Sequence, residues 1–183
     1  MKKHVNEAAI VARTDIGLGA REPLDPRVLA EYLSIPIADL SLFRNKPGSG
    51  ASYFLDTEQE VFSAVTVFSG SRRHIVHNDS HSLPRQNSNI CHELSHGLLL
   101  HGPSPALSAD GLRDWDQVME DEAQWMAGAL LLPEEAVLAA VRNGHSHGQV
   151  ALRYGVSTQM VQWRINETGA RARVNRELAR RGR

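Results

Sequence analysis

The chain has 183 residues, a formal net charge of −1, 42% apolar residues and 22% charged residues. These values are ordinary for a globular protein, and the length predicts one main domain. A charge this close to zero provides no global attraction to nucleic acid or to a membrane surface. The single cysteine, Cys91, excludes an internal disulfide and fits a reducing compartment.

The sequence shows no targeting or membrane signal. The N-terminal residues MKKHVNEAAIVARTD have no apolar core of the kind that signal peptides carry. The longest apolar run, Met126–Leu132, is too short to cross a bilayer. The sequence therefore predicts a soluble cytoplasmic protein without a membrane partner.

The first third of the chain has the patterns of helices. Residues 5–14 have apolar side chains at helical spacing, and Asp25 followed by Pro26 is a typical helix start. The apolar stripe expected for this second helix consists of Val28, Leu29, Tyr32 and Leu33. Residues 34–43 fit either a helix or a strand, and residues 44–52 read as a loop.

A hairpin is predicted next. Val61–Phe68 and Arg73–His77 read as its two strands, with a turn at Gly70, and Tyr53–Leu55 reads as a short strand before them. An edge strand of such a sheet could pair with an extended peptide substrate. Of the two strand histidines, His74 is three residues from His77, so the two face opposite sides and are not expected to share a metal.

The motif HELSH at residues 92–96 lies within the otherwise apolar run 90–100. In a helix His92 and His96 are about 40° apart and one turn apart, so their imidazoles can bind one metal ion. Glu93 then lies on the flank, where a carboxylate can act as general base without binding the metal. This is the zinc-peptidase arrangement. The competing interpretation is a core helix with two hydrogen-bonded histidines.

A catalytic zinc usually takes a third protein ligand. The helix predicted for Trp115–Leu132 offers Glu120 and Glu122, which are about 200° apart around its axis. The face of Glu120 has small neighbours that allow close approach to the histidine helix, whereas the face of Glu122 is bulkier, so we favour Glu120. Asp121 is a weaker candidate. The alternative for these acids is a first helical turn favoured by the helix dipole.

Residues 149–166 have the pattern of a helix-turn-helix, with Gly155 at the turn and Ser157 as N-cap. The second helix is expected to bury Met160, Val161 and Ile165 and to expose Gln159, Gln162 and Arg164. Seven arginines and two glutamates follow from residue 164 onward. Direct DNA binding through this helix and tail is therefore one interpretation. Docking onto the rest of the protein or onto a protein partner is the one that we favour, because the net charge is near zero.

HELSH, followed by EDEAQWMA at residues 120–127 and LLLP at 130–133, resembles the ImmA/IrrE family of metallo-endopeptidases. That family pairs a His-Glu-x-x-His helix with a later Glu-x-Glu-Ala-Asn-x-Phe-Ala helix that ends at Leu-Leu-Met-Pro. The resemblance covers about residues 55–166. Gln124, Met126 and Ser95 depart from the usual Asn, Phe and Gly, but none of them removes a group that the chemistry needs.

The resemblance implies an α+β, zincin-like metallopeptidase fold, in which a small antiparallel sheet packs on the helices that carry the motifs. The expected organisation is a peptidase domain, residues 1–142, and a helix-turn-helix-like segment, residues 143–183. The domain would comprise N-terminal helices (1–43), the hairpin (53–77) and the metal helices (89–132). The implied substrate is a helix-turn-helix transcriptional repressor, whose cleavage would relieve repression in a stress response.

The resulting assignment is a zinc peptidase in which His92, His96 and Glu120 hold Zn²⁺ and Glu93 is the general base. A glutamate ligand also suits Mn²⁺. His101 lies about 140° around the helix from His96 and is not expected to be a ligand. The weak candidates for oxyanion support are Tyr154, His145 and His147, with Tyr154 better explained as a core residue. The remaining alternatives are a regulatory protein that binds DNA or the repressor without catalysis and an inactive scaffold.

Overall fold

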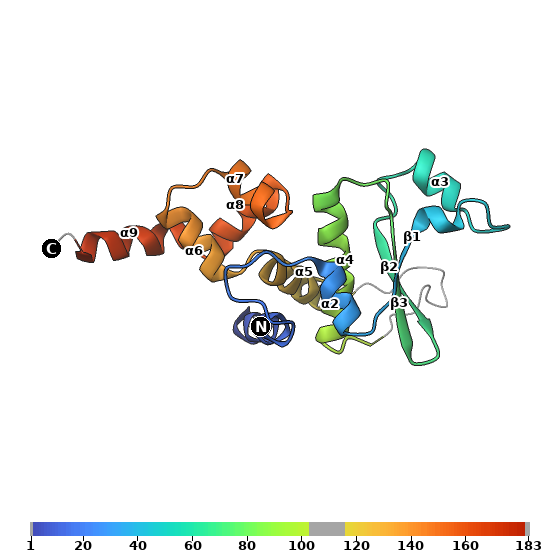
Figure 1. The fold of residues 1–183 in the computed structure, drawn as a ribbon, viewed down its shortest axis with the longest axis horizontal. Helices are drawn as coiled ribbons and strands as arrows, with labels where there is room; N and C mark the ends of the chain where they lie inside the picture. Colours follow the sequence, from blue (N-terminus) through green and yellow to red (C-terminus); the bar gives the residue numbers. More distant parts are fainter. Residues whose placement is uncertain (1, 103–115, 182–183) are drawn as a thin grey trace.

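The computed structural model describes residues 2–102 and 116–181. Its helices and strands are, in order, α1 (Lys2–Asp15), α2 (Pro26–Tyr32), β1 (Ile37–Asp39), the 3-10 helix η1 (Leu40–Phe43), α3 (Ala51–Asp56), β2 (Ala64–Ser69), β3 (Arg72–His77), α4 (Leu83–Leu98), α5 (Gln117–Leu131), α6 (Glu134–Arg142), α7 (His147–Tyr154), α8 (Thr158–Glu167) and α9 (Ala170–Arg181). The fold is α+β, and helices dominate it (Figure 1). Across the described residues, no helix has the length and apolar character that crossing a membrane requires.

The sheet has three strands in the order β1-β3-β2. The hairpin prediction is confirmed: β2 and β3 are antiparallel, and Gly70, with φ of 62°, lies at the turn. The prediction of an antiparallel sheet is wrong for β1, which runs parallel to β3 with Ile37 opposite Ile75. Parallel neighbours need a crossover connection. Here η1, α3 and β2 form the connection between β1 and β3. The segment 1–43, expected to be helical, also contains the strand β1 and the 3-10 helix η1.

The first strand of the hairpin begins at Ala64, whereas the sequence predicted a start at Val61. The short strand predicted for Tyr53–Leu55 is wrong. Those residues belong to α3, which follows Gly50 in a left-handed conformation with φ of 62°. Ala51 and Leu55 are the buried residues of α3, and their i, i+4 spacing is that of one helix face. A six-residue helix is too short for its periodicity to be distinguished from a strand in the sequence.

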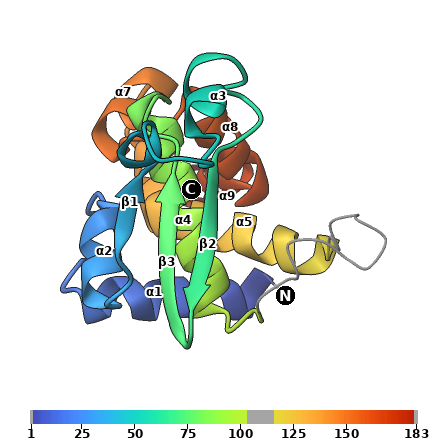
Figure 2. The ribbon, with the colours of Figure 1, turned by 90° about the vertical axis from the view of Figure 1, so that its right-hand side faces the viewer.

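Helix α4 lies between the sheet and α5, and α1 packs on α5 (Figures 1 and 2). The core joins these layers through the fully buried side chains of Ile75 from the sheet, Ile90 and Leu94 from α4, and Met126 and Leu130 from α5. The central position of α4 means that one of its faces packs on α5 while another looks toward the sheet. Any chemistry on α4 therefore takes place between these two layers.

Asp25 caps α2 as predicted, because its side chain accepts a hydrogen bond from the Arg27 N–H. The predicted apolar stripe is wrong in part: Val28 and Tyr32 are 50% and 55% exposed. The buried residues of the helix are Pro26, Leu29 and Ala30. Because α2 has only seven residues and contacts α4 over a short length, a narrow strip is buried instead of a full stripe.

The C-terminal helices lie at the end of the molecule opposite the sheet (Figure 1). Gly155, with φ of 61°, ends α7 in a left-handed conformation, and Ser157 caps α8 by accepting from the Met160 N–H. Met160, Val161 and Ile165 are buried as predicted. Residues 149–166 thus form two helices joined by a tight turn.

Arg164 was expected on the exposed side of α8, and this prediction is wrong: the side chain is fully buried. Its Nε donates to the Leu132 carbonyl over 3.0 Å, and its guanidinium lies over the rings of Trp125 and Trp163. Burial lowers the pKa of Arg164 to about 10, so the side chain is still charged at pH 7. The contact attaches α8 to the end of α5.

Gly128 of α5 is the position that allows this attachment. A Cβ there would lie 2.4 Å from Cζ3 of Trp163 and 3.1 Å from Cδ of Arg164. Gly128→Ala is therefore expected to lower the free energy of unfolding by about 1–3 kcal/mol, since overpacking outweighs the better helix propensity of alanine. Urea unfolding measures this effect. Gly148→Ala in α7 is the matched control, because the nearest atom to its Cβ is 4.0 Å away. Equal stability of both variants would show that the packing of Trp163 and Arg164 does not require a glycine at position 128.

Candidate metal centre

Helix α4 presents the HELSH motif between two layers of the fold. Ser82 precedes the helix in an extended conformation, and Pro84 lies in its first turn, where a missing N–H is tolerated. Cys91 and Leu94 are fully buried and point into the core. His92 and His96 lie on another face of α4 and are partly buried, with side-chain exposures of 23% and 19%.

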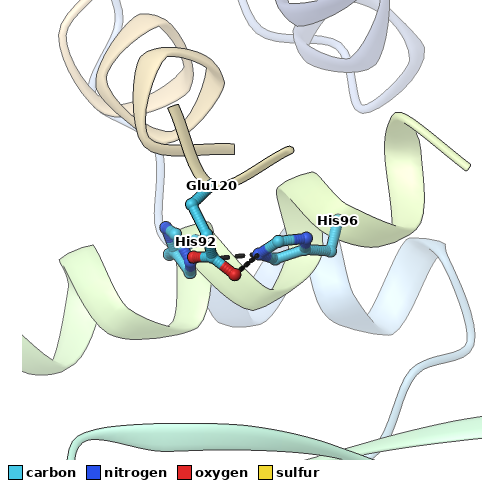
Figure 3. Close-up of side chains that lie close together, drawn as sticks. All are labelled: His92, His96 and Glu120. Carbon is cyan, nitrogen blue, oxygen red and sulfur yellow. Dashed lines mark hydrogen bonds and ion pairs between the residues drawn. The ribbon is translucent and has the colours of Figure 1, made fainter. Parts of the chain in front are cut away.

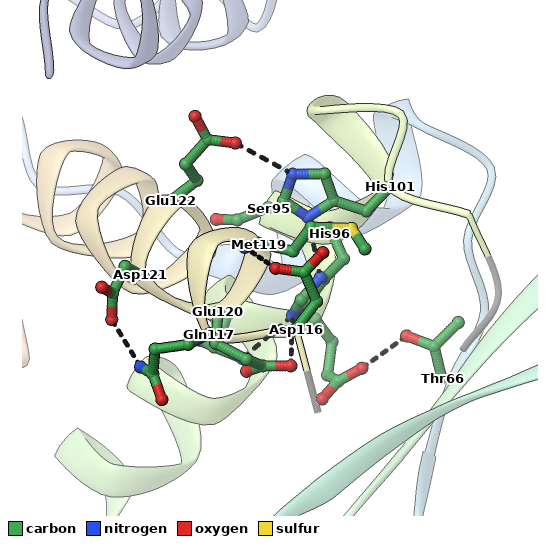
Figure 4. Close-up of polar contacts among 12 residues, drawn as sticks. Thr66, Ser95, His96, His101, Asp116, Gln117, Met119, Glu120, Asp121 and Glu122 are labelled. Atoms are coloured by element: carbon green, nitrogen blue, oxygen red, sulfur yellow. Dashed lines mark hydrogen bonds and ion pairs between the residues drawn. The ribbon is translucent and has the colours of Figure 1, made fainter. Parts of the chain in front are cut away.

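Helix α5 brings the acidic residues to α4. Asp116 caps it, because one carboxylate oxygen accepts from the Val118 N–H over 2.9 Å. The same oxygen accepts from the Met119 N–H over 3.2 Å (Figure 4). This cap fixes the start of the helix one turn before Glu120. Ala123 and Ala127 follow on the same side of α5 and are buried, so a close approach of α5 to α4 is possible at this point.

Three side chains predicted from the sequence converge here (Figure 3). Nε2 of His92 lies 3.0 Å from Oε2 of Glu120 and 3.1 Å from Nε2 of His96. Nε2 of His96 lies 3.7 Å from Oε1 of Glu120. All three ligand atoms lie within 4.8 Å of one another, so the group could hold a metal ion. Two imidazole nitrogens and one carboxylate are a donor set of catalytic zinc, so the residues fit that metal.

The other two acids of α5 lie elsewhere. Asp121 is exposed and accepts from Nε2 of Gln117 over 2.7 Å. Glu122 points to His101, with its Oε2 3.4 Å from Nε2 of that histidine. The structure thus brings Glu120, and neither of its neighbours, to His92 and His96.

The electrostatic setting of His96 favours a neutral imidazole. Burial, reinforced by the nearby His92, lowers the pKa of His96 from 6.5 to about 4. At pH 7 the ring is therefore uncharged and has a free nitrogen lone pair, which is the form that binds metals.

Glu93 lies on the sheet side of α4. Its Oε2 accepts a hydrogen bond of 2.6 Å from Oγ1 of Thr66 in the edge strand β2. The carboxylate thus faces β2, and it is not one of the three converging side chains. Thr66 was not among the residues predicted from the sequence. The only hint in the sequence was that Thr66 lies in the predicted strand ahead of the motif. In the structure Thr66 lies opposite the buried Ile75, on the same face of the sheet.

The expected position of His101 is wrong. Helix α4 ends at Leu98, and Leu100 adopts a left-handed conformation with φ of 57°. The His101 N–H then donates to the His96 carbonyl over 2.9 Å, which turns the chain back toward the helix. As a result, Nδ1 of His101 lies 2.9 Å from Nδ1 of His96. His101 contacts the site although it is not one of the three converging side chains.

The weak candidates for oxyanion support have other surroundings. Tyr154 is buried and donates its hydroxyl to the Arg21 carbonyl over 2.7 Å, as expected for a core residue. His147 lies 3.4 Å from Arg171 of α9, and His145 is exposed. Among the strand histidines, His77 is buried against Asp39, and burial lowers its pKa. The sequence also predicts a loop at residues 103–115 near the site, and these residues lie outside the described part of the chain.

Residues 37–166 match the family model of the IrrE N-terminal-like domain of the M78 peptidases. The match runs from β1 to α8, spans more than half of the chain and contains His92, Glu93, His96 and Glu120. The chain belongs to this family. Membership of the M78 peptidases indicates a metallopeptidase and confirms the ImmA/IrrE resemblance. A search of curated proteins gives no significant match to the chain.

Proposed function

We propose that the protein is a zinc-dependent endopeptidase with a zincin-like active site, in which His92, His96 and Glu120 are the metal ligands. The observation that supports this best is the convergence of two imidazole nitrogens and one carboxylate within 4.8 Å in a chain of the M78 family. Mn²⁺ is the second metal that such a site suits, because a carboxylate is among the donors. The metal, when bound, supplies Lewis-acid activation of water and of the scissile carbonyl.

Glu93 is the proposed general base. It is the residue next to His92, and its side chain faces the sheet side of α4. In the proposed reaction its carboxylate would take a proton from the attacking water and pass it to the leaving amine. The hydrogen bond from Thr66 occupies Oε2 of Glu93 and orients the carboxylate. The other oxygen, Oε1, is the one available for proton transfer.

The edge strand β2 is the proposed guide for the substrate. Among the described strands β2 pairs only with β3, so its outer side presents unpaired backbone groups. Thr66, which contacts Glu93, lies in this strand, and Val67 and Phe68 beyond it are 46% and 37% exposed. An extended peptide that pairs with β2 would pass beside Glu93.

The proposed substrate is a helix-turn-helix transcriptional repressor, cleaved in the cytoplasm to relieve repression in a stress response. The resemblance to the ImmA/IrrE family supports this choice of substrate. An extended segment of the repressor that contains the scissile bond could pair with the edge of β2. Residues 143–183 would then serve to dock the repressor or to brace the peptidase body, residues 1–142.

Direct DNA binding through α8 is the less favoured function. Of the three side chains expected to face DNA, Arg164 is buried and bonded to Leu132. Gln162 donates to Asn166 within the same helix over 2.8 Å. The arginines of α9 remain, but Arg173 pairs with Glu134 at 2.6 Å. We therefore expect this protein to be retained only weakly on random duplex DNA, even at low salt.

The test is to incubate the zinc-loaded protein with candidate repressors, beginning with one encoded nearby, and to identify new chain termini by mass spectrometry. We expect cleavage at one bond, lost on treatment with a chelator and restored by Zn²⁺. A repressor that binds the protein but stays intact under all metal conditions would contradict the proposal and favour a non-catalytic regulator.

A further inference from the structure

His101 and Glu122 form a chain of polar contacts that ends on His96 (Figure 4). Nδ1 of His96 lies 2.9 Å from Nδ1 of His101, and Nε2 of His101 lies 3.4 Å from Oε2 of Glu122. His101 is only 8% exposed, so water has little access to its ring. Neither His101 nor Glu122 belongs to the group of three side chains proposed as ligands.

The proton positions along this chain follow from the geometry. A neutral imidazole carries one N–H, and its other nitrogen is an acceptor or a metal ligand. Nε2 of His96 faces His92 and Glu120, so it must be free of hydrogen if it is to bind a metal. The proton of His96 must therefore be on Nδ1, where Nδ1 of His101 is the acceptor. His101 then has its own proton on Nε2, which faces the Glu122 carboxylate.

We propose that His101 and Glu122 are positioning residues that hold His96 in the tautomer that binds the metal. The inference rests on the proposed metal site and adds the residues that prepare it. It also gives the two glutamates of the Glu-x-Glu sequence different roles: Glu120 is a ligand, and Glu122 orients the histidine that orients His96. Partners of this kind fix the tautomer and the ring orientation of a ligand.

Backbone hydrogen bonds hold His101 in this contact. The left-handed conformation of Leu100 reverses the chain, and the His101 N–H donates to the His96 carbonyl. Arg73 of β3 donates from Nη2 to the His101 carbonyl over 2.9 Å. Both the N–H and the carbonyl of His101 are therefore fixed, which places its ring beside His96 before any metal arrives.

The test compares His101→Asn with His101→Leu in the full chain. The asparagine Oδ1 lies close to the place of the histidine Nδ1 and can accept from His96, whereas leucine has a similar size but accepts no hydrogen bond. Long-range ¹H–¹⁵N NMR of the zinc-free protein reports the tautomer of His96, and competition with a chromogenic chelator reports the zinc affinity. We expect the Nδ1–H tautomer in the wild type and in His101→Asn. In His101→Leu we expect a mixture and a zinc affinity about 10- to 100-fold lower.

A second pair covers the case in which His101→Leu does not fold. Glu122→Gln retains an oxygen that accepts from His101, while Glu122→Met has the same length without one. The methionine variant is expected to show the altered tautomer and the glutamine variant the wild-type one. If zinc binding were weakened equally in both members of a pair, the residue would act only through packing, and the inference would be overturned.

His92→Ala separates this inference from the proposed function. If His92→Ala binds zinc as the wild type does, the proposed metal site is wrong. If His92→Ala loses zinc while His101→Leu retains the wild-type tautomer and affinity, the site stands and the role of His101 and Glu122 is wrong.

Discussion

Glu93→Gln is expected to abolish peptide-bond hydrolysis while leaving zinc bound. The amide has the size of the carboxylate, and its oxygen can still accept the hydrogen bond from Thr66, so the local packing is preserved. It cannot accept a proton from water, and the loss of a general base lowers kcat by about 10²- to 10⁴-fold. The measurement is the cleavage rate of a protein substrate, combined with the zinc content of the same sample.

Glu58→Gln is the control for Glu93→Gln, because it removes an exposed carboxylate that follows α3 and should change neither quantity. Cleavage that survives in Glu93→Gln would refute the assignment of Glu93 as general base. If the biological effect of the protein also survived, the inactive-scaffold interpretation would replace the peptidase.

Glu120→Ala is expected to weaken zinc binding much more than Glu122→Ala does. A four-ligand zinc site contributes about 10–16 kcal/mol, so one ligand is worth about 3 kcal/mol, or about 10²-fold in affinity. Removing Glu122 acts only through His101 and should weaken zinc binding by about tenfold, the lower end of the range of about 10- to 100-fold for such partners. Competition with a chelator at micromolar protein distinguishes these two values.

The pair Glu120→Ala and Glu122→Ala has one outcome that would reverse the assignment. Loss of the metal only in Glu122→Ala would make Glu122 the third ligand and would require a rotation of α5 relative to α4. Loss in both variants to the same extent would mean that neither acid acts alone. Asp121→Ala, at an exposed position of the same turn, should bind zinc as the wild type does.

The three converging side chains could be predicted because local rules determine them. Helix geometry alone places His92 and His96 on one face, whatever the rest of the fold does. The choice of Glu120 over Glu122 needed one more observation, the small residues that share its face of α5. Ala123 and Ala127 are indeed buried, and α5 packs on α4. A hairpin with a glycine turn is a comparably local pattern.

The contacts that the sequence did not reveal depend on tertiary structure. His101 reaches His96 only because Leu100 takes a left-handed conformation, which is uncommon for a leucine and carries no sequence signal. Thr66 reaches Glu93 because β2 is the strand that lies against α4 at that point. The burial of Arg164 likewise depends on Gly128, which lies 36 positions earlier in the chain and leaves room for α8. The parallel pairing of β1 is equally non-local.

The number of metal ions per chain, measured by elemental analysis of the purified wild-type protein, shows whether His92, His96 and Glu120 form a metal site. We expect about one zinc or manganese ion in the wild type and none in the double variant His92→Ala/His96→Ala. A wild type that contains no metal even after incubation with Zn²⁺ or Mn²⁺, or a double variant that still binds one ion, would contradict this assignment.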